Sequence, residues 1–326
     1  MSKLVTIFGG SGFVGRYVSR RMALEGWRVR VATRRPNEAL FVKPYGTVGQ
    51  VEPVLCNIRD EDSVARALQG ADAVVNCVGI ANETSVNSFA AIHVDGAERV
   101  ARLAAKAGIE HMVHVSAIGA DADSDCDYSR TKALGEAAVN DHMPSAVILR
   151  PSAVFGTEDR FFNRFASLTR FGPVLPLAAA ATRFQPVYVD DLAKAVVHCV
   201  CGEASGIYEL GGPEVATMRA LVDTMLGVIH RNRLVFEMPH LMARLMAWDF
   251  DMLQKLSLGL VENKFLTRDQ LRGLAADNVV SDGAREFGDL GIEPVAMATI
   301  LPDYLWRFRP SGQYDAIKKS AANLRS

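Results

Sequence analysis

Three side chains have types and a spacing that could support carbonyl chemistry: Ser116, Tyr128 and Lys132. Tyr128 and Lys132 are four residues apart, so on a helix they share one face and both can reach a single ligand. An ammonium group beside a phenol favours the phenolate and lowers the pKa of the phenol, which makes tyrosine a workable proton donor or acceptor. Ser116 ends an apolar run and could polarise a carbonyl oxygen. A tyrosine and a lysine at this spacing are common by chance, so the prediction depends on their surroundings.

A glycine-rich segment directly follows the first apolar run, Leu4–Phe8. It reads Gly9-Gly10-Ser11-Gly12-Phe13-Val14-Gly15. In a dinucleotide-binding turn, one glycine makes the tight turn, the next lets the backbone approach the pyrophosphate, and the third lets helix and strand pack closely. The following helix presents N–H groups and a positive dipole end to the phosphates. We therefore predict that residues 9–15 bind the pyrophosphate of a dinucleotide, with a purely structural glycine turn as the alternative.

The end of the second apolar run bears on which nicotinamide cofactor is bound. An acidic residue there would bind the ribose 2′-hydroxyl of NAD, whereas this chain has Thr33-Arg34-Arg35-Pro36. Two guanidinium groups suit the 2′-phosphate of NADPH or NADP+, through charge-assisted contacts. We predict NADP(H), with Arg34 and Arg35 at the 2′-phosphate; a solvated basic turn is the alternative. Asp60 could contact the adenine edge or cap the next helix.

Apolar runs that alternate with helical patterns position these residues. The predicted strands are Leu4–Phe8, Arg28–Thr33, Val51–Leu55, Ala73–Cys77, His111–Ser116 and Ala146–Leu149. The predicted helices run from the glycine turn to about Glu25, then Glu61–Leu68, Ala90–Ala107, about Tyr128–Asn140 and Asp190–Cys201. This alternation predicts an α/β fold with a doubly wound parallel sheet of the Rossmann type. Val78, Gly79 and Pro151 follow or end strands and join the predicted cofactor contacts, together with Ser116, Tyr128 and Lys132.

Residues 1–150 are predicted to form the NADP(H)-binding domain, and residues 151–326 a smaller C-terminal α/β lobe whose strands return to the cleft. Within that lobe, Gly172–Leu177 and Ala178–Ala181 are expected to form a Pro- and Ala-rich loop. Met238–Trp248 and the residues up to Leu256 are rich in methionine and large apolar side chains. This segment is either a core helix, a substrate lid, or a contact with a protein or a membrane surface.

Composition excludes several classes of function. The net charge of −1 over 326 residues gives no basic footprint for nucleic acid, and no run of 18 apolar residues could span a membrane as a helix. The cysteines are few and scattered: Cys56, Cys77, Cys126, Cys199 and Cys201. They support neither a metal site nor a disulfide framework. Because the first strand begins near Met1, no targeting segment is expected, and a cytoplasmic location fits best.

Together, the glycine turn, Ser116, Tyr128 and Lys132 resemble the short-chain dehydrogenase/reductase superfamily. Two later segments are typical of its extended and atypical branch. They are Leu149-Arg150-Pro151-Ser152-Ala153-Val154-Phe155-Gly156 and Gln185-Pro186-Val187-Tyr188-Val189-Asp190-Asp191. One position departs from the superfamily's usual asparagine: His93 stands in His93-Val94-Asp95-Gly96. A histidine there could hydrogen-bond the backbone, but the departure puts an intact proton relay in doubt.

A narrower resemblance extends to about residue 300. The segments Glu158–Phe165, Arg170–Pro173, Gln185–Val189, Leu266–Gln270 and Leu290–Ile292 are similar to the NADPH-binding Rossmann accessory subunits of respiratory complex I. This resemblance implies an accessory subunit of a membrane-bound NADH:quinone oxidoreductase, with the other complex I subunits as partners. It also implies a nucleotide held as a structural or regulatory ligand, with no established turnover. The place would be the cytoplasmic side of a bacterial inner membrane.

Two alternatives stay open at this point. One is an NADP(H)-dependent reductase, dehydrogenase or epimerase that acts alone, with Tyr128 as acid/base, Lys132 as its modulator and Ser116 as polariser. The other is a soluble NADP(H) sensor with some other protein partner. The basic residues near the C-terminus, Arg307, Arg309, Lys318, Lys319 and Arg325, are either a solvated tail or a contact with anionic lipid or an acidic neighbouring subunit.

Overall fold

The computed structural model describes residues 2–84, 86–256, 267–310 and 312–314. Lys318, Lys319, Arg325 and Leu266 lie outside the described residues. Within this part, a seven-stranded parallel sheet has the order β11-β6-β5-β4-β1-β2-β3. Its strands are β1 (Leu4–Phe8), β2 (Arg28–Thr33), β3 (Val51–Leu55), β4 (Ala73–Asn76), β5 (His111–Val115), β6 (Val147–Pro151) and β11 (Gly206–Leu210).

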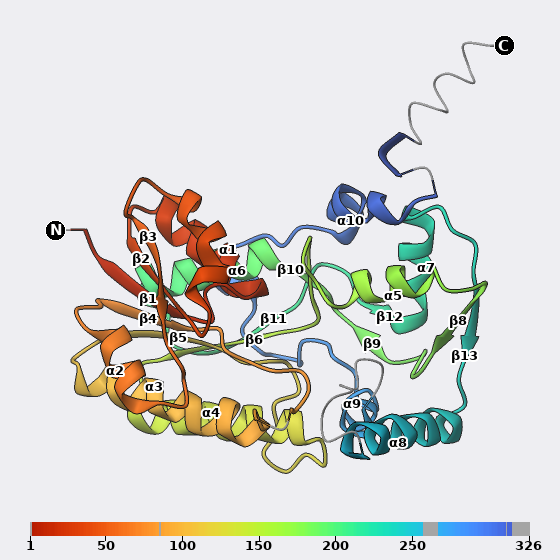
Figure 1. Cartoon of the computed structure of the whole chain (residues 1–326), viewed down its shortest axis with the longest axis horizontal. Helices are drawn as coiled ribbons and strands as arrows, with labels where there is room; N and C mark the ends of the chain where they lie inside the picture. The colour runs from red at the N-terminus through yellow and green to blue at the C-terminus, as the bar shows by residue number, and fades with distance from the viewer. Residues whose placement is uncertain (1, 85, 257–266, 311, 315–326) are drawn as a thin grey trace.

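Helices cover both faces of this sheet (Figure 1). One face carries α1 (Phe13–Leu24) and α6 (Val189–Cys201), and the other α2 (Glu61–Leu68), α3 (Asp95–Lys106) and α4 (Asp127–His142). Side chains alternate between the two faces along each strand, so that Val5 and Ile7 join one core and Phe8 the other. Strands buried on both sides read as continuous apolar runs, which is why the sequence pattern was clear.

The predicted doubly wound fold is confirmed. The strand order reverses between β1 and β4, and in such sheets ligands bind outside the carboxyl ends of the strands at this switch point. The glycine turn directly follows β1 and therefore lies at that place. Two features were not predicted: a ten-residue 3₁₀ segment at Pro36–Tyr45, and a π-helical turn at Ala90–Val94 that precedes α3.

A second lobe packs around its own apolar core of residues from Phe155 to Phe308. It contains α5 (Phe162–Leu168), α7 (Met218–Val228), α8 (His240–Leu256), α9 (Arg268–Gly273) and α10 (Met297–Leu305). Three two-stranded pairs complete it: β7 (Val154–Phe155) with β10 (Val187–Tyr188), β9 (Arg183–Phe184) with β12 (Ala216–Thr217), and β8 (Val174–Leu177) with β13 (Leu234–Glu237).

One expectation for this lobe is wrong. Residues 174–177 form β8 instead of loop, because they pair in parallel with β13, a partner far along the chain that local sequence does not reveal. The division after residue 150 stays a prediction, since β11 and α6 follow that residue yet belong to the first sheet and its helical layer.

Candidate functional site

The glycine turn has the geometry that a pyrophosphate-binding turn requires. Gly9 has φ +74°, a conformation that L side chains rarely adopt, and Gly12 stands at the N-cap of α1 without a side-chain cap. A Cβ on Gly15 would lie 2.2 Å from the Gly9 carbonyl oxygen and 2.6 Å from the Cα of Gly10. The turn therefore packs directly on the helix and leaves its first N–H groups to a ligand. Nucleotide binding by Gly9, Gly10, Ser11, Gly12, Phe13, Val14 and Gly15 stays a prediction.

The end of β2 lies beside this turn. Ser11 Oγ donates to Thr33 Oγ1 at 3.0 Å, which ties the glycine turn to the strand end. Arg34 is exposed, and its Nη1 donates to Asn87 Oδ1 at 3.4 Å. Arg35 is exposed too, but it pairs with Glu38 at 3.2 Å. Of the two predicted phosphate ligands, only Arg34 is without a carboxylate partner among the described residues.

Asp60 is the N-cap of α2. Its Oδ1 accepts a hydrogen bond from the Ser63 N–H at 2.6 Å. The capping alternative is thus confirmed, and the contact with the adenine edge stays a prediction.

Arg16 is a cation at the glycine turn that the sequence reasoning missed. It lies on the first turn of α1 and donates to the carbonyl oxygens of Gly12 and Ser11, both at 3.3 Å. Its guanidinium lies 4.6 Å from the ring centroid of Phe41 and pairs with Glu158 at 3.2 Å. The available signal was a basic residue directly after the last glycine of the motif. Because Glu158 belongs to the second lobe, this contact also links that lobe to α1.

The three predicted chemical residues lie at the carboxyl end of β5. Ser116 Oγ is buried and has no hydrogen-bond partner among the described residues. Lys132 is buried on α4, and its Nζ donates to the Val115 carbonyl oxygen at 3.1 Å. A Cβ on Gly79 would lie 3.5 Å from the same Nζ. The fold therefore brings Gly79, the end of β5 and Lys132 together, and Tyr128 lies one helical turn before Lys132.

The expectation that Lys132 lowers the pKa of the Tyr128 phenol is wrong. Burial raises the pKa of Tyr128 to about 12, and Cys126 adds to that rise. Burial also lowers the pKa of Lys132 to about 8, against a smaller opposing effect of Glu136. Removing the phenolate from water raises the pKa of Tyr128, Lys132 is not among the groups that shift it, and spacing along a helix does not reveal burial.

His93 occupies the position where the superfamily usually has asparagine. Its Nε2 accepts from the Ile80 N–H at 3.1 Å, and its Nδ1 lies 3.1 Å from Thr131 Oγ1. Thr131 Oγ1 is itself within donating distance of the Asp127 carbonyl oxygen, 2.7 Å, so Nδ1 carries the imidazole proton. Burial lowers the pKa of His93 to about 3. The prediction that it could hydrogen-bond the backbone is confirmed, and both ring nitrogens are engaged.

A second buried histidine was not predicted. His114 Nδ1 lies 3.2 Å from Asn76 Nδ2, while Asn76 Oδ1 accepts from the Val78 N–H at 3.1 Å. Burial lowers the pKa of His114 to about 3. The pair fixes the backbone at Val78, one of the predicted cofactor contacts. Polar residues inside two apolar strands were the signal that could have indicated it.

Pro151 and the two aspartates of the segment Gln185–Asp191 make hydrogen bonds and ion pairs that hold the fold together. Pro151 ends β6, and its carbonyl oxygen accepts from the Ile118 N–H at 3.0 Å. Asp190 pairs with Arg21 of α1 at 2.5 Å. The buried Asp191 carboxylate accepts from Lys194 Nζ at 2.6 Å and from the Val295 N–H at 2.7 Å. The two aspartates hold α6 against α1 and the C-terminal segment.

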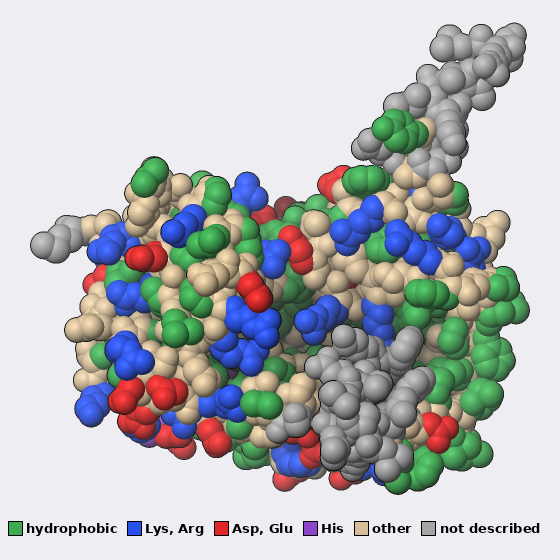
Figure 2. Space-filling model, in the orientation of Figure 1, with side chains coloured by type: hydrophobic (Ala, Val, Ile, Leu, Met, Phe, Trp, Pro, Cys, Tyr) green, Lys and Arg blue, Asp and Glu red, His purple; other side chains and the backbone are tan. Residues whose placement is uncertain are grey.

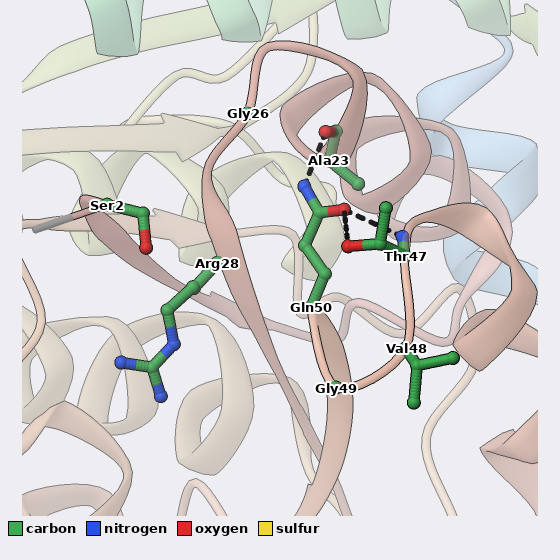
Figure 3. A pocket seen from close by; sticks show the side chains of 8 residues that line it. All are labelled: Ser2, Ala23, Gly26, Arg28, Thr47, Val48, Gly49 and Gln50. Atoms are coloured by element: carbon green, nitrogen blue, oxygen red, sulfur yellow. Dashed lines mark hydrogen bonds between the residues drawn. The ribbon is translucent and has the colours of Figure 1, made fainter.

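A hollow of about 580 Å³ lies at the opposite end of the sheet (Figure 3). It is lined by Ser2, Ala23, Gly26, Arg28, Thr47, Val48, Gly49 and Gln50. The Gln50 side chain is hydrogen-bonded to residues around the hollow. Its Nε2 donates to the Ala23 carbonyl oxygen at 2.6 Å, and its Oε1 accepts from the Thr47 N–H at 2.8 Å. Because the hollow adjoins the start of β2, it is separate from the glycine turn, which follows the end of β1.

The described residues contain neither a metal-binding cluster nor a membrane-spanning helix. They contain no group of three or more His, Cys, Asp or Glu residues placed to hold a metal ion. None of the helices described is long and apolar enough to cross a membrane.

Comparison with known proteins agrees with this geometry. Residues 5–211 match the model of the NAD dependent epimerase/dehydratase family. The solved dTDP-glucose 4,6-dehydratase of Streptomyces venezuelae, with NAD and TYD bound, has the same fold: TM-score 0.70 and 20% identity over 96% of this chain and 99% of that one.

Two curated relatives are similar over nearly the whole chain. Subunit 9 of the NADH dehydrogenase [ubiquinone] 1 alpha subcomplex of Arabidopsis thaliana, a mitochondrial protein, is 34% identical over 95% of this chain and 79% of its own length. The mitochondrial NADH-ubiquinone oxidoreductase 40 kDa subunit of Neurospora crassa is 30% identical over 95% and 80%. Two thirds or more of each relative is therefore matched, and the resemblance predicted from the motifs is confirmed. The chain belongs to the NAD dependent epimerase/dehydratase family and, within it, to the family of these NADH dehydrogenase subunits.

Proposed function

We propose that this protein is an accessory subunit of respiratory complex I that holds NADPH as a structural or regulatory ligand. The observation that carries the proposal is the similarity to two NADH dehydrogenase subunits over 95% of the chain. Their names assign them to the complex, and the extent of the match means that no large part of this chain is left for an unrelated role.

The residues at the switch point fit a nicotinamide dinucleotide. A Cβ on Gly15 would collide with the backbone of Gly9 and Gly10, so the turn packs closely on α1, as suits Gly9 to Gly15 around a pyrophosphate. The buried Ser116 hydroxyl, which has no partner in the described chain, suits a ligand polar group at the other end. Tyr128 and Lys132 would contact the nicotinamide half, with Val78, Gly79 and Pro151 around it.

Arg34 supports the choice of NADPH over NADH. It lies exposed at the end of β2, where no carboxylate of the described residues neutralises it. Arg16 is a second cation at the glycine turn, but it already pairs with Glu158. Guanidinium groups bind phosphate through charge-assisted hydrogen bonds, whereas an unphosphorylated ribose gains little from them.

The surroundings of Tyr128, the predicted acid/base, support retention of the nucleotide over turnover. A general acid or base works best when its pKa lies near the operating pH. Burial raises the pKa of Tyr128 to about 12, far from that condition. His93, with a pKa lowered to about 3 and both nitrogens engaged, offers no proton in its place.

The second lobe carries a surface suited to partners, which we name the apolar edge. It consists of Val174, Leu234, Phe236, Leu241, Met242, Leu245, Trp248 and Met252, all exposed by 40% or more. Hydrophobic side chains gather along this side of the molecule, over β8 and β13 and down to α8 (Figure 2). The small residues Ala243 and Ala247 of α8 are buried instead. A helix that faces its large apolar side chains outward is suited to a protein or membrane contact.

Cations lie next to the apolar edge. Arg233 directly precedes Leu234. Burial lowers the pKa of Arg231, and the charges of Arg233 and then Arg170 lower it further, so the three guanidinium groups lie close together. None of the three forms an ion pair within the described residues. An apolar face beside unpaired arginines fits the rim of an anionic membrane surface. These features support a peripheral location at the membrane, for which we propose the cytoplasmic side of a bacterial inner membrane.

A pull-down of the tagged protein from gently solubilised native membranes tests the proposal. Stoichiometric recovery of the NADH:quinone oxidoreductase subunits, with NADPH in the nucleotide extracted from the complex, is the expected result. A protein recovered alone from the soluble fraction contradicts it.

The unpartnered Ser116 hydroxyl is also what a reductase or dehydrogenase acting alone would need to polarise a carbonyl. A screen of carbonyl substrates with NADPH tests this second candidate. Turnover that Tyr128→Phe abolishes while the nucleotide remains bound would establish it.

A further inference from the structure

The helix that carries Tyr128 and Lys132 begins without a cap of its own. Cys126 is at the N-cap of α4 and makes no side-chain capping bond. The Asp127 carboxylate is engaged with Arg130 instead. The first N–H groups of a helix have no partner within it, so they require an acceptor from elsewhere.

Asp269 of the second lobe supplies that acceptor. Its Oδ1 accepts from the Asp127 N–H at 2.6 Å and its Oδ2 from the Tyr128 N–H at 3.1 Å, across 141 residues of chain. A carboxylate also interacts favourably with the positive end of the helix dipole. One of the two amides that Asp269 holds is that of Tyr128, which is predicted to contact the nicotinamide. The Tyr128 ring packs edge-on against the stacked pair of Phe89, at 5.9 Å, and His93, at 5.5 Å.

The short helix α9 that presents Asp269 is fixed on several sides. Thr267 and Gln270 form a capping box, and Gln270 Nε2 donates to Asn82 Oδ1 at 2.7 Å. Arg272 Nη1 donates to the Asp125 carbonyl oxygen at 3.2 Å. These bonds hold α9 against the start of α4 and against the loop that follows β4.

The opposite side of α9 contacts α8 of the apolar edge. Leu271 is buried with Ala243 and Ala247 of α8, and the Arg268 N–H donates to Asp251 Oδ2 at 3.2 Å. Thus α9 lies between the proposed partner surface and the helix at the nicotinamide end of the site.

We infer that Asp269 is a positioning residue: it fixes the first turn of α4, and with it Tyr128, against the nicotinamide half of the bound nucleotide. Through α9 it also connects α8 to that end of the site. The inference rests on the proposed nucleotide binding. The adenosine half, bound by the glycine turn and the end of β2, does not depend on this contact.

The test compares NADPH with adenosine 2′,5′-bisphosphate, which carries the adenosine half alone. For Asp269→Ala we expect NADPH to bind about tenfold more weakly, as loss of a helix cap allows, and the emission of bound NADPH to move toward that of the nucleotide in water. Affinity for the bisphosphate stays within about twofold. Asp269→Asn keeps one acceptor and gives an intermediate effect. Asp223→Ala, which removes an exposed carboxylate of the same lobe, leaves both affinities unchanged.

Hydrogen exchange provides a readout that needs no nucleotide. The Asp127 and Tyr128 amides exchange faster in Asp269→Ala, while the α1 amides do not change. Unchanged exchange, or equal weakening of both ligands, overturns the positioning role alone. An unsubstituted protein that binds neither ligand overturns the nucleotide assignment, and this role with it.

Discussion

The adenosine and nicotinamide ends of the predicted site differ in how their polar groups are satisfied. At the adenosine end, Arg34 is exposed and makes one long hydrogen bond, 3.4 Å, to Asn87. At the nicotinamide end, Lys132 is buried, His93 uses both ring nitrogens, and the Tyr128 ring packs edge-on against Phe89 and His93. An open, charged end can select a ligand by its phosphate, whereas a closed and hydrogen-bonded end is built to hold one arrangement.

The difference separates recognition from chemistry. Selectivity for a 2′-phosphate needs only accessible guanidinium groups and tolerates motion. Proton transfer needs a group with a suitable pKa, and burial moves the pKa values of Tyr128 and His93 away from neutral pH, to about 12 and about 3. A subunit that keeps its nucleotide without turning it over can accept such shifts.

The largest expected effect comes from Gly15, on which both ends depend. In Gly15→Ala the new Cβ would meet the Gly9 carbonyl oxygen at 2.2 Å, so the turn or α1 must move. We expect the free energy of unfolding to fall by about 3 kcal/mol and binding of both NADPH and adenosine 2′,5′-bisphosphate to be lost. Denaturant unfolding and calorimetry measure the two effects.

Gly227 provides the matched control. It lies on α7, and nothing stands within 4 Å of its Cβ position. Gly227→Ala should raise the free energy of unfolding by about 0.5–1 kcal/mol through helix propensity. Equal destabilisation by the two substitutions would show that close packing at the turn is not the cause.

The next effect belongs to the adenosine end alone. Arg34→Ala should weaken NADPH binding by about 1.5–3 kcal/mol, the value of a charge-assisted hydrogen bond, and leave NADH binding unchanged. Arg35→Ala should have a smaller effect, because Arg35 already pairs with Glu38. Titration calorimetry with both nucleotides decides the matter; unaltered NADPH affinity in Arg34→Ala would refute the assignment of the 2′-phosphate.

The third prediction concerns pH and the nicotinamide end. The folded protein keeps His93 and His114 neutral, with pKa values lowered to about 3, whereas the unfolded chain protonates them near 6.5. The stability that they contribute is present above pH 6.5 and is lost as the pH falls toward 3. Between these two pKa values, each histidine should lower the free energy of unfolding by about 1.4 kcal/mol for every pH unit that the pH falls.

Unfolding of His93→Asn across this range measures one of the two contributions. The slope of unfolding free energy against pH should be shallower by about 1.4 kcal/mol per unit than in the unsubstituted protein. Parallel slopes would mean that His93 is already charged in the folded state.

Sequence patterns predicted the first lobe well because its strands are buried on both faces. Helix α2 spans Glu61–Leu68 and strand β2 spans Arg28–Thr33, both as expected. The sequence predicts a loop where β8 lies, since its partner β13 is distant in the chain and Pro176 interrupts the run. Patterns of residue type likewise identified Ser116, Tyr128 and Lys132, but not the burial that shifts the pKa values of Tyr128 and Lys132.

The smallest expected effect comes from the Tyr128 hydroxyl. If the nicotinamide end only holds the nucleotide, Tyr128→Phe removes one hydrogen-bonding group and keeps the ring against Phe89 and His93. NADPH binding should then weaken by about 0.5–1.5 kcal/mol, the net value of one hydrogen bond. Fluorescence titration of NADPH measures the change, with adenosine 2′,5′-bisphosphate as the control that should not respond.

A loss as large as that of Arg34→Ala would instead mean that the phenol is ionised in the complex, because only bonds to charged groups reach that strength. In that outcome both ends of the site would bind the nucleotide through a charged group, and proton transfer at Tyr128 would again be a candidate.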